Sequence, residues 1–372
     1  MKNKRLLRII GEIEDEYILE AMRKTGRKMK WLQMGIIAAG IMIVLAAGAV
    51  FFESRELPVL NINYNQEEGM GIEGYFAHSI DELQNNNPWN GERIEKLPVY
   101  RNTFYEYTKE WMVTEPDTKK MRQLLKEAAA ALKMNTEQIE IKENIPEGYP
   151  AIYSYYAEDP NYKIDVNAWL NVNIEVKKKE ILPEEYTLYS YASYDELQES
   201  ARYLGDLFSD LLGMKEPAVD ISMGDYTVDG TQFWKISFYE SEGDERKQIQ
   251  SYHFGKIYFY GDEEGNLSSI SYSRGRQEEK IGDYPIIAVK EAVHLLEEGK
   301  YISSVTESFP GKEAVEKIEL VYRTEMNESV FIPYYKFYVK LEEREIKEQD
   351  LKCFGAFYVP AIEEKYIADM VQ

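Results

Sequence analysis

The stretch Tyr162–Val176 reads YKIDVNAWLNVNIEV and shows the clearest structural pattern in the chain. Apolar side chains occupy every second position, with mostly polar neighbours between them, at Ile164, Val166, Ala168, Leu170, Val172, Ile174 and Val176. A period of two is the pattern of a β-strand with one buried face and one face toward solvent. This stretch therefore predicts a half-buried sheet.

Helices are expected on both sides of that stretch. Residues 117–134 contain KKMRQLLKEAAAALKM, which is rich in strong helix formers. A second helix is expected over residues 193–213, where Ser193 and Glu196 match a capping box. A third is expected over residues 285–299, PIIAVKEAVHLLEEG, because proline suits the first helical position and glycine the end.

Further strands are predicted after the second and third helices, at residues 219–228, 233–240, 249–260, 267–273, 315–324, 331–341 and 353–362. One helix followed by an antiparallel meander thus occurs three times. That order predicts an α+β fold of successive helix-plus-meander modules. The domain boundaries expected from this pattern are 1–30, 31–52, 53–116, 117–190, 191–280 and 281–372.

An uncharged apolar run, WLQMGIIAAGIMIVLAAGAVFF, extends from Trp31 to Phe52 and is long enough for a transmembrane helix. Nine basic residues against five acidic ones precede it. The positive-inside rule therefore predicts a single-pass protein of the cell membrane, with a cytoplasmic N-terminus and an extracellular C-terminal domain. The alternative is a cleavable signal peptide ending near Ala47-Gly48-Ala49, although thirty preceding residues are long for such a signal.

The composition excludes several classes of function. The 372 residues include 44 Lys+Arg and 66 Asp+Glu, a net charge of −22, which argues against nucleic-acid binding. With 1 Cys and 3 His, a disulfide framework or a zinc site is not expected, and we predict no metal and no cofactor. The fingerprint-like GMGIEG at residues 69–74 lacks the strand–turn–helix setting of a dinucleotide site and indicates a linker.

The segment before the apolar run predicts a short helix with one apolar stripe. The stripe is the candidate partner-binding site and consists of Leu6, Ile9, Ile10, Ile13 and Tyr17. So short a helix is marginal alone in water, so the stripe needs a second surface. That surface is either a protein partner or, together with the basic cluster at residues 23–30, an anionic lipid membrane.

Two resemblances accompany these patterns. IGEIEDEYILEA, at Ile10–Ala21, followed by a basic linker and one apolar run, resembles the start of anti-sigma-factor-like membrane proteins of the Gram-positive cell envelope. The resemblance implies that the N-terminal part engages a regulator. This chain lacks the His and Cys residues of the zinc-binding anti-sigma class.

The second resemblance covers about Tyr284 to Tyr366. AVKEAVHLLEEGKYISSV, KIELVYRT, FIPYYKFYVKL and GAFYVPAI are similar to a PepSY-type or YycI-type module. In that module a helix ending in Gly-Lys-Tyr precedes a sheet whose strands start with Pro-Tyr or Pro-Val. Such modules restrain a sensor kinase or a protease and imply no catalysis.

Few individual residues point to chemistry. His253 and His294 are expected to be ordinary packed histidines, although His294 has glutamates within one helical turn. Cys353, in CFGAFYV, is expected to be a small buried thiol. The 30 tyrosines are consistent with half-exposed sheet faces, and a sugar or peptide groove is the alternative.

The sequence therefore predicts a non-enzymatic signalling protein, a single-pass membrane regulator or sensor. Its outer part is expected to bind a protein, a peptide or an envelope signal, while its N-terminal helix contacts a cytoplasmic or membrane partner. The alternative is an enzyme, or a propeptide-like module that regulates a secreted protease.

Overall fold

The computed structural model describes residues 56–62, 74–108, 115–135, 140–144, 153–178, 181–227, 230–274, 279–325 and 328–368. The chain divides into two compact units, Met1–Glu56 and Leu57–Gln372. The helices and strands described by the structure all lie in the second unit.

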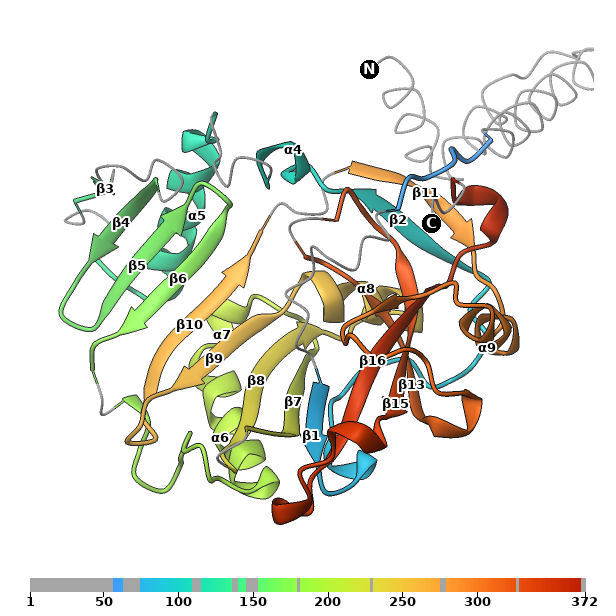
Figure 1. Cartoon of the computed structure of the whole chain (residues 1–372). Helices are drawn as coiled ribbons and strands as arrows, with labels where there is room; N and C mark the ends of the chain where they lie inside the picture. The colour runs from blue at the N-terminus through green and yellow to red at the C-terminus, as the bar shows by residue number, and fades with distance from the viewer. Residues whose placement is uncertain are drawn as a thin grey trace, which may run out of the picture. The chain divides into compact units, whose positions relative to one another are not determined.

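The largest element is an eight-stranded antiparallel sheet (Figure 1). Its strands in spatial order are β3 (Lys142–Asn144), β4 (Ser154–Glu158), β5 (Tyr162–Asn167), β6 (Asn171–Val176), β10 (Leu267–Ser273), β9 (Ile257–Gly261), β8 (Gln232–Glu240) and β7 (Pro217–Tyr226). The β6–β10 pairing sets Ile174 opposite Ile270, so strands about a hundred residues apart join the two halves of the sheet.

The stretch with the period of two forms the hairpin β5–β6. Its turn is fixed by Asn167, whose Oδ1 accepts hydrogen bonds from the backbone N–H groups of Trp169 and Asn171, both at 3.1 Å. Leu170 takes a left-handed conformation, φ 59°. An asparagine that bonds to the backbone ahead of it is a common turn initiator, so the apolar alternation continues on the returning strand.

Helices α5 (Thr118–Ala131), α6 (Tyr194–Leu207) and α7 (Ser209–Leu212) cover one face of this sheet (Figure 1). Asp117 caps α5 by accepting the backbone N–H of Lys120 at 2.9 Å, and Ser193 and Glu196 form the predicted capping box. The apolar sides of the helices pack on the strands, with fully buried Leu125, Leu197, Leu204, Ile164, Ile174 and Phe259 among the core residues.

A second sheet has five antiparallel strands, namely β1 (Gly74–Ala77), β16 (Lys352–Pro360), β15 (Pro333–Lys340), β13 (Val315–Tyr322) and β12 (Ile302–Ser303). A third has three, β11 (Glu279–Pro285), β2 (Lys96–Arg101) and β14 (Val330–Phe331). Helix α9 (Val289–Glu297) packs on β16, and α4 (Tyr105–Thr108) follows β2. Together the two sheets and α9 enclose a second apolar core, which includes Leu97, Tyr284, Leu296 and Phe337.

The predicted α+β fold of successive helix-plus-meander modules is wrong. Three antiparallel sheets dominate the described residues, and the eight-stranded sheet draws strands from both of the first two predicted modules. Strand β1, from the region before them, joins the sheet of the third. The sequence shows which segments have a buried face, but the neighbour of each strand is decided by backbone pairing across the fold.

The strand predicted over residues 249–260 is also corrected. Helix α8 (Glu245–Phe254) occupies its first half, capped by Asp244, which accepts the backbone N–H of Lys247 at 3.1 Å. The buried side chains Ile249 and Tyr252 are three residues apart, one helical turn, rather than on alternate positions. Strand β9 then begins at Ile257.

The sequence-based localisation needs correction as well. Within the ranges that the structure describes, no helix is long and apolar enough to cross a membrane. This finding overturns the prediction of a single-pass membrane protein with a cytoplasmic N-terminus and an extracellular C-terminal domain. The apolar run at residues 31–52 itself lies outside the described residues.

Candidate functional site

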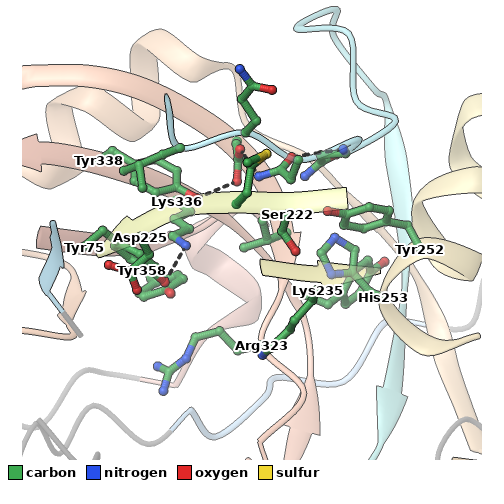
Figure 2. A pocket seen from close by; sticks show the side chains of 18 of the residues that line it. Tyr75, Ser222, Asp225, Lys235, Tyr252, His253, Arg323, Lys336, Tyr338 and Tyr358 are labelled. Carbon is green, nitrogen blue, oxygen red and sulfur yellow. Dashed lines mark hydrogen bonds between the residues drawn. The ribbon is translucent and has the colours of Figure 1, made fainter. Parts of the chain in front are cut away.

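A cavity of about 600 Å³ lies between the edge of the eight-stranded sheet and the face of the five-stranded sheet (Figure 2). Strand β7 supplies Ser222, and α8 supplies His253. Across the cavity lie Lys336 of β15, Tyr358 of β16 and Tyr75 of β1. Charged, amide and aromatic side chains therefore converge from segments far apart in the sequence.

The segment after the short 3-10 helix Ile80–Glu82 joins the two sheets and forms one wall of the cavity. On the β7 side, Gln84 and Met223 exchange backbone hydrogen bonds of 3.1 and 3.2 Å. The Asn86 backbone N–H donates to Asp220 Oδ1 at 2.8 Å, and Asn86 Oδ1 accepts from the Ile221 N–H at 3.1 Å. The segment thus covers what would otherwise be an open strand edge.

On the side of the five-stranded sheet the same segment bonds to β13. Asn85 Nδ2 donates to Glu319 Oε1 at 2.7 Å, and Asn87 Nδ2 donates to the Leu320 carbonyl at 3.1 Å. The asparagine run, which reads as a loop in the sequence, is therefore a polar connector between two sheets.

A bulge in β7 brings this connector close. The β7–β8 register shifts between Ser222 and Asp225, and Gly224 has φ +97°. A Cβ on Gly224 would lie 1.7 Å from the carbonyl oxygen of Glu82. Only glycine permits both the backbone angle and this approach, so the position is fixed by sterics.

Lys336 is a buried cation among tyrosine rings. Its Nζ lies 4.3 Å from the ring centre of Tyr338, 4.4 Å from that of Tyr75 and 5.9 Å from that of Tyr358. Nζ also donates to the Tyr75 hydroxyl at 2.9 Å (Figure 2). The residue is 9% exposed, and among the described residues no carboxylate lies within ion-pair distance of it. Cation–π contacts stabilise such a charge, and the ammonium group can still bind an anion.

Arg323 is a second cation in the lining of the cavity. Its Nη2 pairs with Glu328 at 3.0 Å and its Nε lies 3.6 Å from Glu325. Its Cζ is 5.3 Å from the ring centre of Tyr358, the ring that Lys336 also contacts. Nη1 is buried and has no hydrogen-bond partner in the described part of the chain. Burial raises the pKa of Glu328 to about 7, against the opposing effect of Arg323.

His253 presents an unused acceptor. Its Nε2 is buried without a partner among the described groups, while the ring bonds to the Leu320 backbone. Burial lowers the pKa of this imidazole to about 3, and the charges of Lys256 and Lys336 lower it further. The ring is therefore neutral near pH 7, and a neutral ring that donates through Nδ1 keeps a lone pair on Nε2.

Glu319, also in the lining, is fully engaged. Lys317 Nζ lies 2.8 Å from Oε1, which also accepts from Asn85, and Oε2 accepts the Tyr338 hydroxyl at 3.0 Å. Burial alone would raise the pKa of this carboxyl, but Lys317 and Lys336 hold it below its usual value. Glu319 is thus an ionised group with both oxygens occupied.

The residues singled out from the sequence lie mostly elsewhere. The stripe Leu6, Ile9, Ile10, Ile13 and Tyr17 falls outside the described residues, as does most of the glycine motif at 69–74. His294 is 70% exposed and pairs with Glu298 at 3.1 Å. Cys353 is buried, and burial raises the pKa of its thiol to about 11. Of these residues only His253 lines the cavity.

Sequence reasoning missed Lys336, Arg323 and Tyr75. A signal was present, since Lys336 interrupts the apolar and aromatic strand PYYKFYVK of β15. A lysine there is either snorkelling or meets a partner inside the fold. Among the described residues no group of three or more His, Cys, Asp or Glu could hold a metal ion.

Comparison with known proteins assigns no family and no function to the chain. No protein-family model matches the chain, and no curated protein sequence matches it. A solved structure of an uncharacterized protein from Eubacterium rectale ATCC 33656 is similar, with 12% identity and a TM-score of 0.34. The similarity covers 72% of this chain and 84% of that one.

Proposed function

We propose that this protein acts by binding a small organic ligand in the cavity between the two sheets. The observation that carries the proposal is a pair of buried polar atoms in side chains that line the cavity, Arg323 Nη1 and His253 Nε2, which the described residues leave without partners. Buried polar groups are almost always hydrogen-bonded, because leaving one unsatisfied costs about 1–3 kcal/mol. A ligand with complementary groups would satisfy both.

The size and lining of the cavity support this proposal. A volume of about 600 Å³ falls within the range of small-molecule sites. Aromatic rings, including Trp234, Tyr252 and Tyr322, give apolar surface, and a few polar groups can fix the orientation of a ligand.

Binding is favoured over catalysis by the relation of the polar groups to one another. Ser222 is the lining hydroxyl of nucleophile type, and in the described part of the chain it forms no hydrogen bond to a base. Nucleophilic catalysis needs such a pair.

We also keep the N-terminal stripe at residues 6–17 as a proposed contact for a protein partner, on the sequence pattern alone.

The proposal is tested by filling the cavity. Ligands are first found by a thermal-shift screen of small organic compounds and are then measured by calorimetry. Ser222→Trp, which places a large ring in the cavity, is expected to abolish their binding. Ser271→Trp, on β10 and away from the cavity, is the matched control and is expected to bind normally. Equal binding by both variants would place the ligands elsewhere and refute the proposal.

A further inference from the structure

We infer that the ligand carries a single carboxylate, which is bound by Lys336 Nζ and Arg323 Nη1. This inference rests on the proposed function and adds to it the chemical class of the ligand. Four observations carry it: the unpaired ammonium, the free guanidinium nitrogen, the aromatic ring between them and the acidic groups around them.

The ammonium group has unused donors. Lys336 has three N–H groups, and one of them is directed to the Tyr75 hydroxyl. The carboxylate opposite Lys336 on the neighbouring strand is Glu319, whose oxygens already bind Lys317, Asn85 and Tyr338. Lys336 is therefore a buried cation, and the carboxylate opposite it on the neighbouring strand is occupied by other groups.

A second lysine of this protein, Lys256, is also largely buried and has a different environment. Lys256 Nζ lies 3.2 Å from the ring centre of Tyr252 and 2.6 Å from Asp220 Oδ2. That site has both an aromatic ring and a carboxylate. The Lys336 site has the rings alone, so an external carboxylate would complete the arrangement that Lys256 has within the fold.

Arg323 provides the second donor. Its Cζ and the Lys336 Nζ lie 5.3 and 5.9 Å from the ring centre of Tyr358, so both cations contact one ring, and both residues line the cavity. A carboxylate that reaches both residues would accept charge-assisted hydrogen bonds, which are the strong ones.

The acidic lining limits the charge of the ligand. Asp225, Glu319 and Glu325 also face the cavity. A dianion such as a phosphate monoester would lie close to these carboxylates and be repelled, whereas a single negative charge is matched by Lys336, because Arg323 already pairs with Glu325 and Glu328. The apolar remainder of the ligand would pack on the tyrosine rings.

The test uses three probes of one shape, measured by calorimetry on the full chain: benzoate, its neutral isostere benzamide, and phenyl phosphate. Benzoate is expected to bind at least about tenfold more tightly than benzamide or phenyl phosphate. Lys336→Met should remove the preference for benzoate and leave benzamide binding unchanged. The control Lys235→Met, at an exposed lysine of the same cavity, should keep the preference.

A second variant covers the case in which Lys336→Met does not fold. Tyr75→Phe keeps the ring but frees the ammonium group from its hydroxyl acceptor, and is expected to bind benzoate at least as tightly as the parent. Loss of the benzoate preference in Tyr75→Phe would count against the inference.

The remaining outcomes separate this inference from the proposed function. Equal binding of benzoate and benzamide, tighter binding of phenyl phosphate, or no benzoate binding up to about 10 mM would each overturn the carboxylate assignment alone. Equal loss of the benzoate preference in both lysine variants would overturn the role of Lys336. Benzoate binding that survives Ser222→Trp would instead overturn the cavity as the binding site.

Discussion

Lys256 and Lys336 are both lysines buried against tyrosine rings, and they differ in what lies on the other side. Lys256 meets Asp220, whose side chain is 2% exposed, at 2.6 Å. Lys336 faces the cavity and the hydroxyl of Tyr75. One charge is neutralised within the fold, whereas the other is directed into space that a ligand can enter.

The difference separates a charge that is neutralised within the fold from one that we propose binds a ligand. Asp220 is itself held by the Asn86 N–H, the Ser237 hydroxyl at 3.2 Å and the Tyr252 hydroxyl at 3.4 Å. Such a complete cluster ties β7, β8 and α8 to the connector between the sheets. A buried pair of this kind is costly to break, because removing one partner leaves the other charge buried and uncompensated.

The largest effect is expected at the paired lysine. Lys256→Met leaves Asp220 buried without its cation and should lower the free energy of unfolding by about 3–5 kcal/mol. Lys280→Met breaks the exposed pair with Asp283 and should cost less than about 1 kcal/mol. Urea denaturation of both variants measures the contrast, and equal losses would show that Lys256 is not a structural tie.

The next effect concerns the β7 bulge between Asp220 and the cavity. Gly224→Ala combines a left-handed backbone with a clash against the Glu82 carbonyl, and should cost about 2–4 kcal/mol. Gly230→Ala has a similar φ, +82°, but nothing within 4 Å of its Cβ, and should cost about 1 kcal/mol. Thermal denaturation compares the two. A similar loss in both variants would show that the bulge relaxes without strain.

A smaller effect is expected from His253, whose pKa is lowered by both lysines in addition to burial. The pKa is about 3 in the folded chain, below the ordinary value of 6.5, so the unfolded chain takes up a proton first as pH falls. The contribution of this group to the free energy of unfolding is therefore present above pH 6.5 and is lost on acidification. The loss should be about 2 kcal/mol between pH 7 and pH 5.

The pH effect is measured as the difference in unfolding free energy between the parent and His253→Gln across that range. The parent should lose its advantage over the variant as pH falls. His294→Gln, at an exposed ring, is the control and should follow the parent curve. A His253→Gln curve parallel to that of the parent would contradict the buried neutral imidazole.

The smallest effect on stability is expected at the unpaired lysine. Lys336→Met replaces a buried cation by an apolar side chain of similar length and leaves no carboxylate without a partner, because Glu319 keeps Lys317, Asn85 and Tyr338. The free energy of unfolding should change by less than about 1 kcal/mol. A loss as large as that of Lys256→Met would mean that Lys336 also stabilises the fold.

The helices were the most predictable part of the fold. The capping box of Ser193 and Glu196 is a local signal, complete within one turn of chain, and the structure confirms it. The strand prediction for residues 249–254 was wrong because a short run with mixed spacing fits a strand and a helix equally. The N-cap that decides for a helix, Asp244, lies outside this run.

The candidate site was much less predictable. Lys336 and Tyr75 are 261 positions apart, and Asn86 and Asp220 are 134 apart. No spacing rule connects such residues, because their meeting depends on which sheet edges pack together. His253 was noted in the sequence, but its burial beside Leu320 and Tyr322 was not.

The sequence by itself determined which segments have an apolar face, where α5 and α6 begin, and that the chain carries a net charge of −22. These properties depend on composition, period and caps, which are local. Tertiary structure alone decided that β6 pairs with β10, that the asparagine connector joins two sheets, and that Lys256 is paired while Lys336 faces a cavity. The physical reason is that the surroundings of a buried charge are set by strands brought together through long-range packing.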